Sequence, residues 1–268
     1  MIPSSVVIRG AGDLATGIAH RLWFSGFAVI MLDLPRPLVV RRTVSFATAV
    51  YEGSIEVESV EAKLCDDPER AGEYLENRVI PVLVDPEAES LALLQPSIII
   101  DAIMAKNNKV TKITDAELVI GIGPGFTAER DVHCVVETKR GHNLGKVYYR
   151  GAAAEDTSEP GMIGGYGRER ILRAPSGGTF MARKEIGDIV RAGDVIAVIG
   201  QTEIRTEIDG LVRGMLYSGL EVTTGMKIGD VDPRGKSVNY NSISDKARAV
   251  GGGVLEAILH HYCFKSSL

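Results

Sequence analysis

The residue types that could do chemistry first occur in a glycine-rich turn that follows an apolar run at 6–8. Its spacing, Gly-x-Gly-x-x-Ala, is typical of turns that receive a diphosphate. The glycines let the backbone approach the phosphates, and the following helix offers free N–H groups. A second apolar run, 28–32, ends at an acid that could bind ribose hydroxyls. The pattern predicts a dinucleotide ligand held by these residues: Gly10, Ala11, Gly12, Asp13, Leu14, Ala15, Asp33 and Arg36.

Arginines at 36, 41 and 42 follow this acid and could hold a further phosphate through bidentate hydrogen bonds. Asp33 would repel the 2′-phosphate of NADP, because both groups are negative. The residues therefore leave NAD and NADP both open. The alternative interpretation of the arginines is a solvated basic patch.

A second glycine cluster, 121–125, also follows an apolar run. It predicts a loop at the carboxyl end of a sheet, where open α/β folds bind ligands. Titratable residues follow it closely, as far as Asp156, with Thr157 beside it. A bent loop with a solvated charged face is the alternative. The candidate residues of this second ligand loop are Gly121, Gly123, Gly125, Thr127, Arg140 and His142.

The motifs of familiar catalysts are missing. The chain has no Walker loop, no Gly-x-Ser-x-Gly elbow, no His-Glu-x-x-His motif and no tyrosine followed four residues later by a lysine. Cys134 lies in an apolar run, where we expect a small buried hydrophobe rather than a nucleophile. The acids Asp230, Asp232 and Asp245 fit turn and cap roles better than a metal site. We predict no metal, and the catalytic residues are unknown.

Composition narrows the class of partner. The 268 residues are 45% hydrophobic and 24% charged, with a net charge of −5, which is typical of a globular protein and argues against a nucleic-acid partner. The apolar runs are too short to span a membrane, and no secretory leader precedes the first strand. The three cysteines are far apart and match neither a disulfide nor a zinc pattern. We therefore expect a protein of the reducing cytoplasm.

The elements that would position these residues alternate between strands and helices. Further apolar runs indicate strands at 79–84, 98–101, 118–122 and 132–136, and two segments indicate helices, 67–77 and 86–94. Residues 55–65 alternate with a slip in phase and indicate a weak strand. The pattern predicts an α/β fold in which residues 1–165 form a Rossmann-like nucleotide-binding domain with a doubly wound parallel sheet.

Residues 171–232 contain an internal repeat with a period of 32 residues. Gly178 matches Gly210, for example, and Val190 matches Val222. Each copy predicts three short strands, and two copies related by a pseudo-twofold axis would make a small barrel. We expect this all-β domain at 166–235. A C-terminal helical segment at 236–268 would follow, with Ser244 as its cap and a kink or a close backbone approach at 251–253.

The repeat contains Ala174–Gly178, Gly187–Ile196 and Asp209–Gly210, and through these segments it resembles the barrel-sandwich hybrid of biotinyl and lipoyl carrier domains. A carrier domain presents a lysine at the tip of the hairpin between the repeats. Here that tip is Gly200–Arg205, without a lysine. We therefore expect no covalent biotin or lipoate, and a structural or docking module instead.

Six segments carry a wider resemblance: 9–17, 41–46, 121–128, 140–145, 227–234 and 243–248. Through them the chain resembles the YqeB-type accessory proteins of selenium-dependent molybdenum hydroxylase systems, and its N-terminal half resembles the Rossmann portion of XdhC-type proteins. The resemblance implies an accessory or maturation protein that binds a nucleotide-bearing molecule and docks a molybdenum hydroxylase client. It adds molybdopterin cytosine dinucleotide to NAD and NADP as a ligand, since this molecule also contains a diphosphate.

Two other functions fit the same residues. One is an NAD(P)-dependent oxidoreductase that uses a proton donor such as His142. The other is a non-catalytic scaffold that senses a nucleotide. In each case we expect a dinucleotide ligand, no nucleic-acid or membrane partner, and a homo-oligomer.

Overall fold

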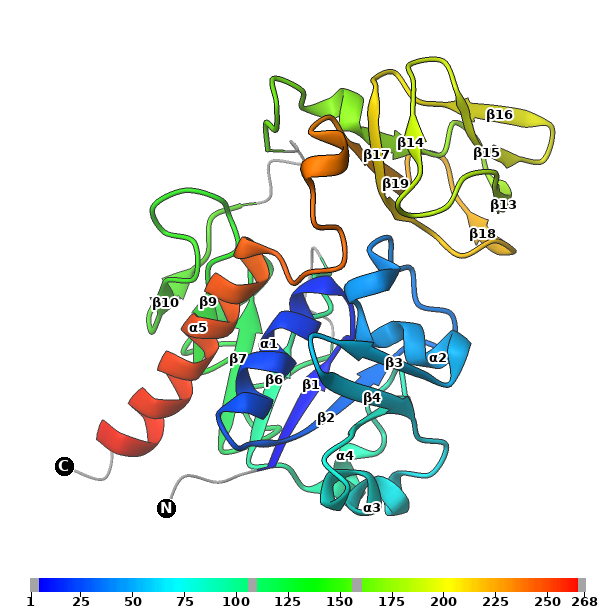
Figure 1. Ribbon diagram of the computed structural model, residues 1–268. Helices are drawn as coiled ribbons and strands as arrows, with labels where there is room; N and C mark the ends of the chain where they lie inside the picture. Colours follow the sequence, from blue (N-terminus) through cyan, green and yellow to red (C-terminus); the bar gives the residue numbers. More distant parts are fainter. Residues whose placement is uncertain (1–4, 106–109, 156–160, 265–268) are drawn as a thin grey trace. The chain divides into compact units, whose positions relative to one another are not determined.

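The computed structural model describes residues 5–105, 110–155 and 161–264. The chain divides into two compact units. Unit 1 comprises Met1–Pro37, Ser45–Asp156 and Ile243–Leu268, and unit 2 comprises Leu38–Val44 and Thr157–Ser242. Figure 1 labels the helices and strands of both units.

Unit 1 is built on a nine-stranded sheet in the order β10-β9-β7-β6-β1-β2-β5-β4-β3. Neighbours from β9 to β4 run parallel, whereas the two outermost pairs, β10–β9 and β3–β4, are antiparallel. A separate two-stranded sheet pairs β8 (Thr127–Ala128) with β11 (Gly151–Ala152). The strands of the large sheet are β1 (Ser5–Arg9), β2 (Ala28–Asp33), β3 (Ser54–Val57), β4 (Val60–Leu64), β5 (Ile80–Val84), β6 (Ile98–Asp101), β7 (Leu118–Ile122), β9 (Cys134–Val136) and β10 (Val147–Tyr148).

The helices of unit 1 are few and mostly short. Among the described residues, α1 (Asp13–Phe24) and α5 (Asp245–Leu259) are the two α-helices longer than six residues. The others are α2 (Ala49–Glu52), α3 (Ala71–Glu76) and α4 (Leu91–Leu94). Asp67 caps the 3₁₀ turn Pro68–Arg70 before α3, which confirms the helix predicted at 67–77, whereas the helix predicted at 86–94 is reduced to α4.

The expected Rossmann-like, doubly wound parallel sheet is wrong for this chain. The sheet is mixed, because the chain reverses at both of its edges, through a tight turn between β3 and β4 and through the loop 137–146 between β9 and β10. The described residues that connect β6 to β7, and those that connect β7 to β9, contain no α-helix, so the regular alternation of strand and helix stops after β6. Polar and turn-forming residues in these connections do not supply a helix with an apolar face.

The phase slip noted at 55–65 is a two-residue turn between β3 and β4. Glu58 and Ser59 have positive φ angles of 47° and 66°, as a tight hairpin requires. The Glu58 carboxylate accepts hydrogen bonds from Arg248 at 2.6 and 2.7 Å and from the Ile243 N–H at 2.8 Å. Burial by itself would raise the pKa of Glu58, but these bonds outweigh it and hold that pKa below its ordinary value.

Helices α1 and α5 lie side by side against the sheet (Figure 1), in close backbone contact. A Cβ atom on Gly17 of α1 would lie 2.6 Å from the Cβ of Ala247, and one on Gly251 of α5 would lie 2.9 Å from the Gly17 carbonyl oxygen. Gly251 therefore serves a close approach, one of the two roles predicted for the glycines at 251–253. Ser244 caps α5 as predicted, since its hydroxyl accepts the Ala247 N–H.

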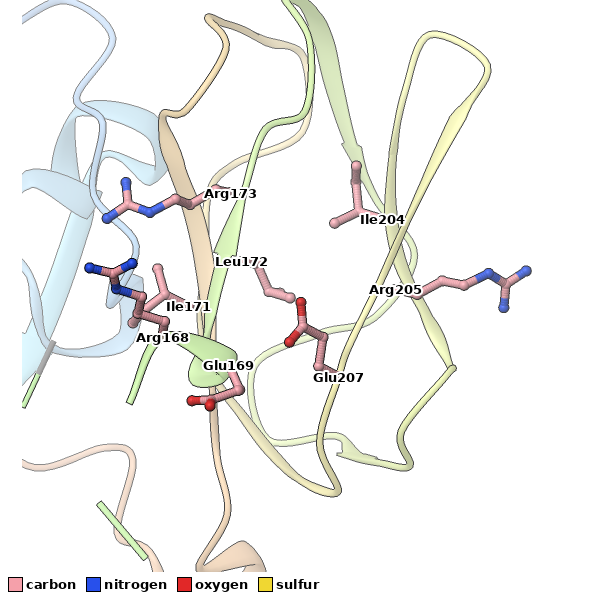
Figure 2. A pocket seen from close by; sticks show the side chains of 8 residues that line it. All are labelled: Arg168, Glu169, Ile171, Leu172, Arg173, Ile204, Arg205 and Glu207. Atoms are coloured by element: carbon pink, nitrogen blue, oxygen red, sulfur yellow. The ribbon is translucent and has the colours of Figure 1, made fainter. Parts of the chain in front are cut away.

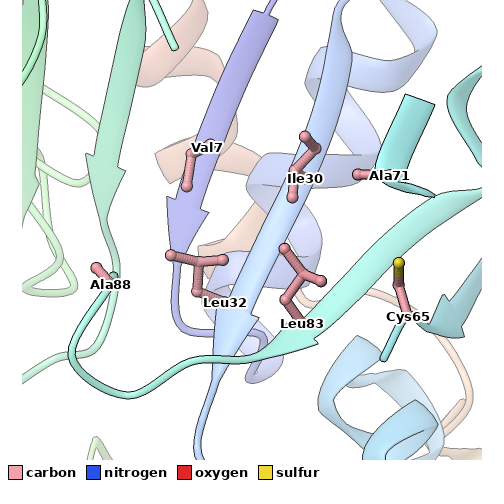
Figure 3. Close-up of a cluster of buried hydrophobic side chains, with 7 residues drawn as sticks. All are labelled: Val7, Ile30, Leu32, Cys65, Ala71, Leu83 and Ala88. Carbon is pink, nitrogen blue, oxygen red and sulfur yellow. The ribbon is translucent and has the colours of Figure 1, made fainter. Parts of the chain in front are cut away.

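One cluster of buried side chains joins three parallel strands to the helices beneath them. Figure 3 shows Val7 of β1, Ile30 and Leu32 of β2 and Leu83 of β5 packed with Ala71 of α3. The strand segments are almost wholly apolar, which is what burial on both faces of a sheet requires. This packing holds the carboxyl ends of β1 and β2 in place.

Unit 2 consists of two four-stranded antiparallel sheets, β12-β19-β17-β14 and β16-β15-β13-β18. The two copies of the repeat exchange strands, because β13 of the first copy pairs with β18 of the second, and β17 of the second pairs with β14 of the first. The pseudo-twofold pairing agrees with the 32-residue period, but the sheets are separate, so the expected barrel is wrong. The strands are β12 (Ile171–Arg173), β13 (Gly178–Ala182), β14 (Ile189–Val190), β15 (Val195–Ile199), β16 (Thr202–Arg205), β17 (Gly210–Met215), β18 (Leu220–Val222) and β19 (Lys227–Asp232).

The described helices lie within residues 5–105, 110–155 and 161–264. None of the helices there is long and apolar enough to cross a bilayer.

Candidate ligand site at the carboxyl edge of the nine-stranded sheet

The Gly10–Ala15 bend joins the end of β1 to the start of α1. Gly10 has φ +93°, and a Cβ at this position would lie 3.0 Å from the Ala102 carbonyl oxygen, so the turn needs glycine. Gly12 is the N-cap of α1, with φ −71° and ψ −174°, and no side chain in the described residues caps the helix through a hydrogen bond. The first N–H groups of a helix have no intrahelical acceptor, so this bend has the features of an anion site.

Residues 46 and 47, which follow β2 in the chain, stabilise the Gly10–Ala15 bend through hydrogen bonds. The Ala11 carbonyl accepts the Ala47 N–H at 2.8 Å and the Thr16 hydroxyl at 3.2 Å. The Thr16 oxygen in turn accepts the Phe46 N–H at 2.8 Å. Because Ala11, Thr16 and Phe46 are buried, these bonds are shielded from water and fix the backbone of the bend.

Asp33, at the end of β2, reaches the same bend. Its Oδ2 accepts the Ala11 N–H at 2.7 Å, and its Oδ1 accepts the Leu34 N–H at 2.7 Å. Burial raises the pKa of this carboxyl, and the two N–H donors act against that rise. Each oxygen keeps a lone pair for a ligand hydroxyl. Arg36 is exposed. Burial raises the pKa of Tyr51, and the positive charge of Arg36 partly opposes that rise.

A buried polar network that the sequence analysis missed lies directly below the bend. Arg9, the last residue of β1, is opposite Asp101, the last residue of β6, and the two form an ion pair at 3.6 Å. Thr111 lies between them, accepting a hydrogen bond from Arg9 and donating one of 2.5 Å to Asp101. Asp101 was detectable as the acid that ends the run 98–100, but the partners of this acid were not.

The segment after β6 touches both glycine turns. Gly10 approaches Ala102, and a Cβ on Gly123 would lie 3.2 Å from the Met104 Cε and 2.8 Å from the Thr138 Oγ1. Gly123 has φ +75°, and Met104 adopts a positive φ of 62°. The side chain of Met104, with those of Ile103 and Leu34, is exposed although apolar. The structure therefore brings Gly121 and Gly123 to the same edge of the sheet as the Gly10–Ala15 bend.

Other candidates of the second loop have different roles. Arg140 makes two hydrogen bonds of 2.6 and 2.9 Å to Asp245, which ties it to the start of α5. Thr127 lies in β8, where its N–H binds Asp131 at 2.8 Å. His142 is exposed in the turn before β10, and Gly125 has φ +108° in the turn before β8. Asp156 and Thr157 lie outside the described residues.

Two further titratable residues, Glu137 and Cys134, have structural roles rather than ligand-binding ones. Glu137 is 1% exposed, and its carboxylate accepts the N–H groups of Thr138, Lys139 and Ala154 at 2.7, 2.7 and 2.8 Å. It therefore anchors the loop between β9 and β10. Cys134 is buried, and burial raises the pKa of its thiol to about 12, which confirms the prediction of a small hydrophobe rather than a nucleophile.

Arginines 41 and 42, considered above for phosphate binding, are engaged inside unit 2. Arg41 donates to the Tyr240 and Ser242 carbonyls at 3.3 and 2.9 Å, and Arg42 pairs with Glu185 at 3.0 Å. Of the three arginines, Arg36 is the one that belongs to unit 1, and its side chain is exposed. Among the described residues, no group of three His, Cys, Asp or Glu side chains is arranged to hold a metal ion.

Comparisons with known proteins give a relative but no function. No family model matches the chain. A curated protein of Escherichia coli (strain K12), named "Uncharacterized protein YqeB", is 50% identical over 254 residues, which are 95% of this chain and 47% of that protein. The chain therefore spans about half the length of this relative.

Similarity to solved structures is weak. A succinylglutamate desuccinylase/aspartoacylase from Rhodobacter sphaeroides matches with 27% identity and a TM-score of 0.22, over 24% of this chain and 21% of that one. The ectoine utilization protein EutE (DoeB) from Ruegeria pomeroyi matches with 10% identity and a TM-score of 0.25, over 85% of this chain and 86% of that one. Likenesses of this size assign neither a fold nor a function.

These findings overturn the assignment expected from the resemblance. The relative's name states no activity, and no family model matches the chain. The role of accessory protein in a selenium-dependent molybdenum hydroxylase system finds no support and is not retained. The two alternatives, an NAD(P)-dependent oxidoreductase and a nucleotide-sensing scaffold, find none in these comparisons either.

Proposed function

We propose that unit 1 binds a dinucleotide, with the diphosphate at the Gly10–Ala15 bend. The observation that supports this most is the geometry of Gly12. It is an N-cap with an extended backbone, it has no Cβ, and no described side chain caps α1 in its place. Backbone N–H groups at such a position form charge-assisted hydrogen bonds to phosphate oxygens.

The surroundings of the bend suit the other parts of such a ligand. Asp33 retains hydrogen-bonding capacity for ribose hydroxyls while it is held by the Ala11 N–H. The exposed apolar side chains of Leu34, Ile103 and Met104, at the ends of β2 and β6, offer a surface for a planar base. NAD, NADP and molybdopterin cytosine dinucleotide are the ligands to compare, because each has a diphosphate.

Isothermal titration calorimetry of the full chain with each of these three ligands tests the proposal. Gly12→Ala places a methyl group where the phosphates would approach, and its φ of −71° is open to alanine, so the fold should persist. We expect affinity to fall about 10- to 100-fold, the effect of losing one charge-assisted hydrogen bond. Gly72→Ala is the matched control, since a Cβ there meets nothing within 4 Å.

A second variant separates the ligands. Asp33→Asn removes the negative charge but keeps one acceptor oxygen, so NADP should bind more tightly than to the native chain. NAD should bind less tightly, because a neutral amide is the weaker acceptor for ribose hydroxyls. If none of the three ligands binds, or if Gly12→Ala and Gly72→Ala bind alike, the proposal is refuted.

The remaining expectations stay predictions of ours. They are a homo-oligomer, no nucleic-acid or membrane partner, no covalent biotin or lipoate, a cytoplasmic location, and domain boundaries at 165/166 and 235/236.

A further inference from the structure

Unit 2 contains a cavity of about 460 Å³, a size within the range of small-molecule sites. Its lining comes from both sheets of the unit, with Leu172 from β12 and Ile204 from β16. Figure 2 shows these two side chains extending toward the space between the strands. They are 4% and 6% exposed and, with Ile171, form the apolar part of a lining whose other five residues are charged.

Three arginines line the cavity, and in Figure 2 the guanidinium group of the first, Arg168, extends away from Leu172. The Arg173 guanidinium donates to the Gly225 carbonyl at 2.8 Å. The Arg205 guanidinium donates to the Gly193 carbonyl at 2.6 Å and to Glu203 at 2.5 Å. In Figure 2 both groups extend away from Leu172. These residues therefore contribute their aliphatic stems to the cavity wall rather than positive charge.

Glu207 is the acid that these cations leave unneutralised. It has no hydrogen bond or ion pair with any described residue, and Figure 2 shows its carboxylate beside Leu172. Its backbone is held in place, because the neighbouring Thr206 hydroxyl accepts the Ile208 N–H at 3.3 Å and donates to the Ile208 carbonyl at 2.9 Å. Glu169 adds a second negative charge to the lining, and the pKa of its carboxyl is lowered by backbone hydrogen bonds.

We propose that this cavity binds an alkylammonium group, with the cation on Glu207 and the aliphatic chain against Leu172 and Ile204. The apolar side chains of Leu172 and Ile204 beside the exposed carboxylate of Glu207 match the chemistry of a lysine side chain or of a small aliphatic amine. Burial of the chain drives binding, and the charge-assisted hydrogen bond to Glu207 selects an amine over a neutral or acidic molecule. The site lies within unit 2 and is independent of the dinucleotide proposal for unit 1.

Calorimetry with four probes tests this assignment on the full chain. Cadaverine represents a free amine, and Nα-acetyl-lysine-N-methylamide represents a lysine within a polypeptide. Nα-acetyl-norleucine-N-methylamide and glutarate are the neutral and acidic comparisons. We expect at least one amine to bind about 10-fold more tightly than the norleucine compound, the effect of one charge-assisted hydrogen bond, and glutarate to bind more weakly still. Preference for cadaverine identifies a free amine as the ligand, and preference for the lysine compound identifies a polypeptide side chain.

The variant Glu207→Gln keeps the size of the side chain and removes its charge. We expect amine affinity to fall about 10-fold, while Glu221→Gln, a change to an exposed acid of β18, leaves it unaltered. Circular dichroism checks that both variants are folded. The proposal is overturned if the amines bind no better than the norleucine compound, if glutarate binds best, or if Glu207→Gln binds the amines as the native chain does.

Discussion

Two neighbouring glycines of α5 should respond in opposite directions to the same substitution. A Cβ on Gly251 would lie 2.9 Å from the Gly17 carbonyl oxygen and 3.1 Å from the Arg21 Cβ. A Cβ on Gly252 would meet nothing within 4 Å. We expect Gly251→Ala to destabilise unit 1 and Gly252→Ala to stabilise it.

The expected changes in the free energy of unfolding of these two variants follow from two terms. Alanine relieves the entropic penalty of glycine inside a helix, which contributes about 0.5–1 kcal/mol to stability and is the same at both positions. At Gly251 the added methyl group also overpacks the interface with α1, which costs about 1–3 kcal/mol because the nearest atom is backbone and cannot swing aside. The difference between the two variants measures the overpacking term by itself.

Urea unfolding followed by tryptophan fluorescence gives both free energies of unfolding. The chain has one tryptophan, Trp23, and it lies on α1, the helix against which α5 packs. The emission therefore reports on the unit that the substitutions perturb. If Gly251→Ala proves as stable as Gly252→Ala, the close approach of α1 and α5 is not the reason for the glycines, and the reasoning fails.

Three further predictions concern the same unit. Gly10→Ala should lower the free energy of unfolding by about 1–3 kcal/mol, because its φ of +93° strains any other residue. Arg9→Met should lower it by about 3–5 kcal/mol, because Asp101 then stays buried without its cation. The pKa of Glu58 lies below its ordinary value of 4.5, so the stability from its contact with Arg248 is complete above about 4.5 and is lost as the pH falls through the lower, folded value. Arg248→Met should reduce that acid sensitivity.

The same unfolding assay can contradict each of these three predictions. Native stability in Gly10→Ala would mean that the turn tolerates a side chain. Arg9→Met with a loss below about 1 kcal/mol would mean that water reaches Asp101. Identical loss of stability between pH 5 and pH 2 in the native chain and in Arg248→Met would show that the acid transition does not involve Glu58.

Local elements could be predicted because their signals lie close together in the sequence. The strand, turn and helix at 6–24 follow from an apolar run, two glycines and a helical pattern, and the structure has β1 and α1 there. Ser244 was identifiable as a cap, and the 32-residue repeat predicted two related copies of a strand unit, although not the exchange of strands between them. Within the candidate site, the Gly10–Ala15 bend and Asp33 were found this way.

The network below that bend could not be found from local patterns. Arg9, Asp101 and Thr111 are far apart in the sequence, and each by itself has the appearance of an ordinary strand or loop residue. The sequence predicts Arg140 as a ligand residue, because it is charged and follows a glycine turn, but the structure pairs it with Asp245 of α5, near the other end of the chain. Partners at such separations depend on strand order, which periodicity does not encode.

The sequence alone determined where the chain turns, which segments are apolar enough to be buried, and which backbone positions exclude a side chain. These are properties of single residues and their immediate neighbours. Tertiary structure decided that the sheet is mixed rather than doubly wound, that α5 packs on α1, and that the segment 102–104 touches both glycine turns. Such outcomes depend on which set of long-range contacts is most stable. Alternative sets differ little in free energy until the whole unit is assembled.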